Sequence, residues 1–154
     1  MTTRFVAISF AWLAACSTDS QNLDDPQLPP EGAADVSAWL AKGFYKAWRC
    51  EPAGHAARDP SPHGRNRICN NDAIKNASPT GAYPVGAASA KELLDDTDAI
   101  VGYAVYRKLA DGSDGSNWYW FEMTSGNTID GTGVDVCVGC HSHAPRDFVF
   151  TAVP

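Results

Sequence analysis

Residues 99–108 read AIVGYAVYRK, a stretch in which side chains of different bulk alternate along the chain. Val101, Tyr103 and Val105 would face one side and the residues between them the other, which is the period-2 pattern of a β-strand. Residues 87–94 also have strand character, and the polar link Asp-Asp-Thr-Asp that joins the two stretches suits a tight hairpin. The centre of the chain therefore predicts an antiparallel pair of strands.

Further strands are expected on both sides of this hairpin. A turn at 111–116 leads into a strand over 118–124, which begins with four consecutive aromatic residues. We expect a Gly/Asp/Thr-rich loop over 126–133 and a short last strand over 147–151. On the N-terminal side, residues 65–70 are expected to form another short strand.

Two helices complete the expected elements. Asp35 is a good N-cap for a helix that runs to about residue 49, because apolar residues follow at helical spacing. Asn71 is expected to cap one or two helical turns over 72–77, and residues 52–64 between the helices hold several breakers. The predicted fold class is α+β, a mainly antiparallel β-sheet with an N-terminal helix.

The pentapeptide Cys137-Val138-Gly139-Cys140-His141 is the attachment signature of a c-type haem. On a short helical turn, both thiols can form thioethers to one porphyrin, and His141 becomes the axial ligand of the haem iron. A zinc site would need a second Cys/His pair, and a thioredoxin-like dithiol would lie early in the chain. The sequence therefore predicts one covalently bound haem c at a C-terminal haem-binding turn.

The start of the chain is typical of an export segment. Residues 1–15 carry Arg4 and an apolar run that is too short to span a membrane. Leu-Ala-Ala-Cys at 13–16 resembles a bacterial lipobox, so cleavage would leave a lipid anchor on Cys16; an ordinary signal with Cys16 unmodified is the alternative. Both versions place the protein on the bacterial periplasm side, and Ser17 favours the outer membrane over the inner one.

Residues 16–34 are polar and proline-bearing and are expected to form a disordered tether. Residues 35–154 then form one haem domain with its own core. The formal charge of −6 becomes −7 when residues 1–15 are removed, since they contain only Arg4 among charged side chains. A mildly acidic body argues against a nucleic-acid partner and against charge-driven contact with anionic lipid. The membrane is therefore reached through the lipid anchor only.

Five cysteines occur in the chain, and three are assigned to lipid and haem. Cys50 and Cys69 remain, and an exported domain rarely keeps two idle thiols. We therefore predict a Cys50–Cys69 disulfide, which would stabilise the fold by about 3 kcal/mol in the chain-entropy model. Two separately buried free thiols are the alternative.

The remaining histidines bear on the sixth coordination position of the iron. His143 is tethered to the same side as His141 and is not expected to ligate. His55 and His63 lie in an irregular stretch long enough to fold over a haem, so each is a candidate sixth ligand or an ordinary loop residue. Neither of the two methionines is suitably placed. The sequence therefore predicts an open distal position.

Several blocks of sequence, in order over residues 39–151, resemble the cytochrome P-460 family, which includes the cytochromes c′-beta. The blocks are Pro62-His63-Gly64 with Arg67-Ile68 and Asn70-Asn71, Pro84-Val85-Gly86 with Lys91-Glu92, the strand 102–108, Trp118-Tyr119-Trp120, and residues 137–141 followed by Asp147-Phe148-Val149-Phe150-Thr151. The resemblance implies a mostly antiparallel-sheet homodimer with a five-coordinate c-haem. Some members oxidise hydroxylamine, and the c′-beta members bind nitric oxide and other small gases in an apolar pocket.

The resemblance also implies roles for single residues. In the oxidising members the haem is crosslinked to a lysine, and Lys91 matches that position; an ordinary strand lysine is the alternative. These members use a carboxylate after the haem motif for proton transfer. The only acid there is Asp147, which we expect to serve the structure instead. Arg146 is a candidate distal or propionate partner.

Three functions follow from these features. The leading hypothesis is an exported mono-haem c-type cytochrome with an open distal iron site, which binds nitric oxide or oxidises hydroxylamine. As an enzyme it would be a haem oxidoreductase with a periplasmic electron-transfer partner. The alternative is a six-coordinate electron-transfer cytochrome c with His55 or His63 as distal ligand. A non-catalytic gas sensor or sink is the third.

Overall fold

The computed structural model describes residues 27–59 and 61–153. The predicted signal segment, Cys16 and most of the predicted tether lie outside these residues. In the part that is described, no helix has the length and apolar character needed to cross a membrane.

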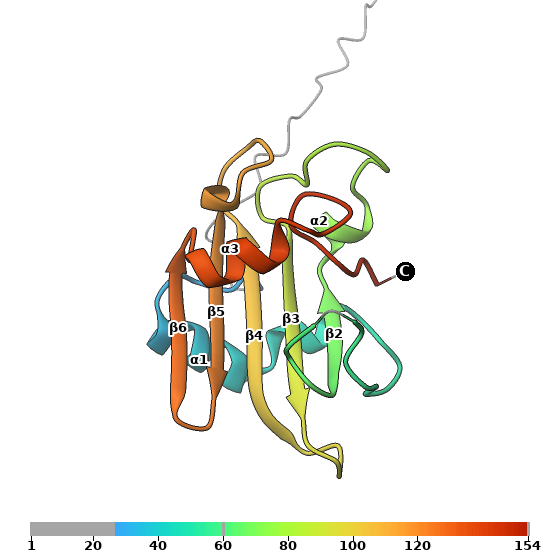
Figure 1. Cartoon of the computed structure of the whole chain (residues 1–154), viewed down its shortest axis with the longest axis vertical. Helices are drawn as coiled ribbons and strands as arrows, with labels where there is room; N and C mark the ends of the chain where they lie inside the picture. Colours follow the sequence, from blue (N-terminus) through green and yellow to red (C-terminus); the bar gives the residue numbers. More distant parts are fainter. Residues whose placement is uncertain (1–26, 60, 154) are drawn as a thin grey trace, which may run out of the picture.

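An antiparallel sheet of six strands forms the centre of the described chain, and the strands follow one another in sequence order (Figure 1). They are β1 (Arg49–Cys50), β2 (Asn66–Asn70), β3 (Ala88–Leu94), β4 (Ile100–Lys108), β5 (Trp118–Thr124) and β6 (Asn127–Thr132). Each strand pairs with the next, so the sheet is a meander without crossovers. The α+β class with a mainly antiparallel sheet is confirmed, and the central hairpin is the β3–β4 pair.

Helices pack on both faces of this sheet. The described elements are α1 (Ala33–Lys42), α2 (Asp72–Lys75) and α3 (Asp135–His141), with 3-10 turns η1 (Phe44–Ala47) and η2 (Gly115–Asn117). Figure 1 shows α1 behind the sheet and α3 crossing in front of it. Asn71 caps α2 as predicted, since its Oδ1 accepts a hydrogen bond from Ile74 N at 3.2 Å.

The sheet has a hydrophobic core on each face, and the aromatic strand β5 contributes side chains to both. Tyr119 and Phe121 pack in the core under α1, whereas Trp118 and Trp120 pack in the core under α3. This split follows from the strand geometry, because successive side chains point to opposite faces. All four side chains are at most 3 % exposed. Four consecutive aromatic residues in one strand therefore fill two layers.

The helix predicted over 35–49 has different boundaries in the structure. It begins at Ala33 and ends at Lys42. Gly43 adopts a left-handed conformation with φ 71°, and its N–H donates to Leu40 O. A left-handed glycine is a common helix stop, because it satisfies a terminal carbonyl without steric cost. The chain then continues as the 3-10 turn η1.

Two strand predictions are wrong. Residues 126–133, predicted as a loop, contain β6, which pairs with β5 along its whole length. Residues 147–151, predicted as a last strand, form none: Arg146 and Val149 make one isolated bridge, and the two residues between them have positive φ. An extended strand needs negative φ, so the chain turns at this point instead.

The segment before α1 is fixed to the sheet. Arg107 Nη1 on β4 donates to Pro29 O at 2.8 Å, and Gly32 N donates to the Tyr119 hydroxyl at 3.0 Å. Pro29 is buried. The ordered contacts therefore begin N-terminal to residue 35, where the domain boundary was predicted.

Asp130 on β6 caps α1 from outside the helix. Its Oδ2 accepts from Ala33 N at 2.9 Å, and its Oδ1 accepts from the Tyr119 hydroxyl. We expect Asp130→Ala to lower the free energy of unfolding by about 1 kcal/mol, as for a lost N-cap, in urea denaturation. Asp130→Asn keeps an acceptor and serves as the control. Equal losses in both variants would show that capping is not the cause.

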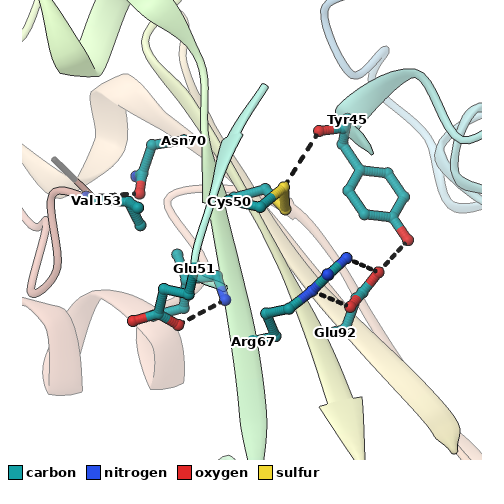
Figure 2. Close-up of a disulfide and its surroundings, with 9 residues drawn as sticks. Tyr45, Cys50, Glu51, Arg67, Asn70, Glu92 and Val153 are labelled. Atoms are coloured by element: carbon teal, nitrogen blue, oxygen red, sulfur yellow. Dashed lines mark hydrogen bonds and ion pairs between the residues drawn. A yellow bond between two sulfur atoms is a disulfide. The ribbon is translucent and has the colours of Figure 1, made fainter. Parts of the chain in front are cut away.

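Cys50 and Cys69 form a disulfide, as predicted (Figure 2). They are register partners of β1 and β2, so the bridge fastens the two-residue edge strand β1 to the sheet. On the same face, Glu92 accepts hydrogen bonds from the Tyr45 hydroxyl at 2.7 Å and from Arg67 Nε at 2.8 Å. These contacts stabilise the sheet face under α1, away from α3.

Candidate functional site

The helix α3 carries Cys137, Cys140 and His141 across the face of the sheet opposite α1 (Figure 1). Its close approach depends on Gly115 in η2. A Cβ at Gly115 would lie 2.4 Å from Val138 Cγ1, which is closer than such atoms can come. A glycine is therefore needed beneath the pentapeptide 137–141.

His141 lies in an aromatic environment and has a fixed ring orientation. Its ring centroid is 4.7 Å from that of Trp120, 5.3 Å from that of Phe150 and 5.7 Å from that of Tyr106. Its Nδ1 is 2.7 Å from Phe148 O, which can only accept, so Nδ1 carries the proton. Burial lowers the pKa of His141 to about 4. The ring is therefore neutral at pH 7, and Nε2 keeps its lone pair for a metal.

A cavity of about 470 Å³ opens beside His141, a size in the usual range for cofactor sites. Cys140 and His141 form one wall, the loop before β2 forms another, and β2 to β4 supply the floor. The floor residues are Ile68, Ser89, Lys91 and Tyr106. Cys140 and His141 thus share one hollow with a floor of mixed apolar and polar side chains.

Lys91 lies on this floor, so the structure brings it together with Cys140 and His141. Burial lowers its pKa to about 8, although the charges of Glu122 and Glu51 raise it. A lysine with a lowered pKa has a larger neutral fraction at pH 7, and the neutral amine is its nucleophilic form.

Glu122 was not found from the sequence, and it lies on the same face of the sheet as Lys91, with one strand between them. Both residues pair with Ala104 across the sheet, Lys91 from β3 and Glu122 from β5. The small side chain of Ala104 leaves a second hollow of about 80 Å³, which both residues line together with Cys137. The sequence did contain one signal for Glu122. It is a single carboxylate two residues after Trp120, and this spacing puts it on the same face of the aromatic strand as Trp120.

His63 shares the cavity with His141, and the two ring centroids are 6.4 Å apart. His63 Nδ1 lies 3.3 Å from Glu122 Oε2. This hydrogen bond lowers the pKa of Glu122; burial opposes the shift, and the charge of His63 adds to it. Glu122 is therefore a carboxylate at pH 7, placed to hold the His63 ring by its Nδ1.

Of the other residues considered from the sequence, His55 and Arg146 lie outside the cavity lining and His143 lies at its rim. His55 uses both ring nitrogens, with Nε2 2.9 Å from Glu51 Oε2 and Nδ1 2.6 Å from Ala56 O. His143 is exposed at the cavity rim, and its Nδ1 lies 3.1 Å from Gly139 O. Arg146 Nε donates to Gly81 O, and its guanidinium stacks on a tyrosine ring outside the cavity lining.

The Asp147 side chain does not line the cavity. Its carboxylate pairs with Lys108 Nζ at 2.7 Å, and both side chains are almost fully buried. The structural use expected for Asp147 is therefore confirmed. Asp59 is the carboxylate that lines the cavity itself, and Glu122 lines the smaller hollow.

The two thiols of the pentapeptide are free, in contrast to Cys50 and Cys69. Burial raises the pKa of the Cys137 thiol to about 11, and the charge of Glu122 adds to this shift. A redox dithiol needs a lowered thiol pKa, so this environment disfavours thioredoxin-like chemistry. Among residues 27–59 and 61–153, no group of three or more His, Cys, Asp or Glu side chains is arranged to hold a metal ion.

No family model, no curated protein and no solved structure matches this chain. The functional argument therefore rests on the residues of this cavity.

Glu51 anchors the loop that carries His63. Its carboxylate accepts from Ile68 N at 2.9 Å and pairs with His55 and Arg58. Burial alone would raise its pKa, but these hydrogen bonds outweigh burial and lower the pKa below the ordinary value of 4.5.

Because the folded pKa of Glu51 is depressed, its stabilisation is present above the unfolded pKa and is lost as pH falls through the folded pKa. We expect the loop 52–65 to loosen as the pH falls below the ordinary pKa value of 4.5, seen as a lower protection factor against hydrogen exchange at Ile68 N. Glu51→Gln should exchange faster at all pH values, without this pH step. An equal step in Glu51→Gln would contradict the assignment.

Proposed function

We propose that this chain is an exported mono-haem c-type cytochrome with an open distal iron position, which binds or oxidises small nitrogen species such as nitric oxide or hydroxylamine. The observation that carries the proposal is the tautomer and orientation of the His141 ring. Its Nδ1 proton is directed to Phe148 O, so Nε2 is the nitrogen available to iron, on the same helix as two free thiols.

The donor set fits a c-type haem. Cys137 and Cys140 would hold the porphyrin by thioethers, and His141 would be the axial ligand. When bound, the haem supplies a redox-active iron that takes small ligands. The cavity floor places Ile68 and Tyr106 beside the polar side chains of Ser89 and Lys91, so a small ligand would meet both apolar and hydrogen-bonding groups there.

Proton handling would fall to residues beside the cavity. The Glu122 carboxylate and the His63 ring share a hydrogen bond at 3.3 Å, so a proton released by a substrate has an acceptor pair there. Lys91, which lines both hollows, provides a third titratable group. This arrangement supports an oxidising role in which protons leave with the electrons.

The test is expression of the full chain with a c-type maturation system. We expect coloured protein that keeps haem after denaturation and has a high-spin, five-coordinate optical spectrum. The control, Cys137→Ser with Cys140→Ser, should lose the covalent haem. Colourless wild-type protein would refute haem attachment, and a low-spin spectrum in both oxidation states would refute the open position.

A six-coordinate electron carrier is the second candidate, and the position of His63 favours it. Metal–nitrogen bonds are about 2 Å long, so ring centroids 6.4 Å apart are compatible with two imidazoles on opposite sides of one metal. In this case His63→Ala should convert a low-spin spectrum to high-spin. His55→Ala is the matched control, because both ring nitrogens of His55 are engaged elsewhere.

The choice between oxidation and gas binding depends on Lys91. Mass analysis of the haem peptides after tryptic digestion reports whether residue 91 is covalently joined to the porphyrin. A third link that is absent in Lys91→Met would support hydroxylamine oxidation. Two links only, without turnover of hydroxylamine, would support a nitric-oxide-binding protein.

Lipid attachment, a periplasmic electron partner and a homodimer belong to the same proposal. Attachment of a labelled fatty acid to the wild type but not to Cys16→Ala would support the anchor, and labelling of neither would refute it.

A further inference from the structure

We propose that the buried pair Lys108–Asp147 is a positioning device for His141, because it fixes the turn whose carbonyl holds the His141 ring. The effect on a bound haem rests on the proposed function above, whereas the effect on the His141 ring does not. The inference depends on three linked observations: a strained turn, its buried anchor, and the contact of the turn with His141.

The strained turn spans residues 146–149. Val149 N donates to Arg146 O at 2.8 Å, and the two central residues, Asp147 and Phe148, have φ of 39° and 65°. Positive φ at both central positions is characteristic of a type I′ turn, which normally takes Asn-Gly. Aspartate tolerates this region, but for a bulky residue such as phenylalanine it is an outlier. Such strain persists only where the surroundings over-determine the backbone.

The anchor is the Asp147 side chain. Its carboxylate receives Lys108 Nζ at 2.7 and 2.8 Å and Tyr83 N at 2.6 Å. The Lys108 side chain is 0 % exposed and that of Asp147 is 1 % exposed. Lys108 belongs to β4 in the interior of the sheet, and its ammonium also lies 4.8 Å from the ring centroid of Trp118. The turn is therefore fixed to the end of an interior strand of the sheet.

The turn meets the haem-binding helix at Phe148. The Phe148 carbonyl accepts from His141 Nδ1 at 2.7 Å, and its ring packs toward Gly115, which also contacts Val138 of α3. The strained residue is thus the one whose carbonyl holds the histidine. Second-shell acceptors of this kind set the tautomer, orientation and basicity of a ligating histidine. Lys108 and Asp147 would act on His141 through this carbonyl.

The test removes both charges together, so that neither is left unpaired. The first variant is holoprotein that carries Lys108→Met with Asp147→Gly. Glycine at position 147 still permits positive φ, but it has no side chain that could fix the turn. We expect the iron–histidine stretch in resonance Raman spectra to move to lower frequency, because a looser hydrogen bond makes His141 a weaker donor. The second variant, Lys108→Met with Asp147→Asn, keeps an acceptor for Tyr83 N, so its iron–histidine stretch should move less. It also provides the test if the first variant does not fold.

The matched control is Arg67→Met with Glu92→Gln, a charge pair on the opposite face of the sheet. It should leave the stretch unchanged even if stability falls. An unchanged stretch in the Lys108/Asp147 variants, or an equal shift in the control, would overturn the proposal.

A second measurement separates this inference from haem binding. In the full chain with Cys137→Ala and Cys140→Ala, ¹⁵N NMR should report His141 as the Nδ1–H tautomer. The Lys108→Met/Asp147→Gly changes should convert it to a mixture of tautomers. If wild type proves colourless but this conversion occurs, the proposed function fails and the positioning role stands. A tautomer that does not respond would refute the positioning role, whatever the haem result.

Discussion

Lys108→Met alone is expected to lower the free energy of unfolding by about 3–5 kcal/mol, the usual cost of leaving a buried charge without its partner. The Asp147 carboxylate is 1 % exposed and would keep only the Tyr83 N–H as a donor. Gly112 O would also lose the Lys108 ammonium. Urea denaturation followed by tryptophan fluorescence measures the loss.

Adding Asp147→Asn to Lys108→Met should recover most of this loss. Asparagine carries no charge, can accept from Tyr83 N, and tolerates the positive φ of this position. Replacing a whole buried ion pair by neutral groups is often close to neutral for stability. If the double variant is no more stable than Lys108→Met, an unpaired charge is not the cause of the loss.

The strands at the centre of the sheet could be predicted because they carry runs of apolar and aromatic side chains, which pack into the cores on its two faces. Residues 99–108 and 118–124 carry apolar or aromatic groups at successive positions, and the structure forms β4 and β5 there. β6 was missed for the opposite reason. The edge strand Asn127–Thr132 is largely exposed, so its sequence need not alternate, and pairing with β5 decides its conformation.

The end of the chain shows how a tertiary contact overrides local preference. Residues 147–151 have the composition of a strand, with Phe148, Val149 and Phe150 in succession. The Asp147 side chain is instead drawn to Lys108, almost 40 positions earlier, and the backbone turns there. Single-sequence patterns carry no information about such a distant partner.

The candidate site was predictable where chemistry lies in adjacent residues. Cys137, Cys140 and His141 follow from one pentapeptide. Glu122 was not predictable in the same way, because its relation to Lys91 depends on register: both pair with Ala104 from opposite sides. A shift of one residue in either strand would turn one of these side chains to the α1 face.

The disulfide is expected to stabilise both the fold and the wall of the cavity. We expect Cys50→Ala with Cys69→Ala to lower the free energy of unfolding by about 3 kcal/mol, because the unfolded chain is no longer closed into a loop. β1 contains only Arg49–Cys50, so the bridge is a large part of what joins this short strand to β2. The loop after β1 carries His63, and it should become sensitive to proteolysis before the sheet does.

Dithiothreitol treatment of the wild type provides the control, since it breaks the bridge without removing sulfur atoms from the core. Thioethers to haem would resist this treatment, so the effect would report on Cys50 and Cys69 alone. We expect the reduced wild type to lose nearly as much stability as the double variant. In the oxidised protein, Glu51→Ala should loosen the loop with a smaller loss of stability. If reduction leaves both urea midpoint and loop cleavage unchanged, the hydrogen bonds of Glu51 and the β1–β2 register hold this edge without the covalent link.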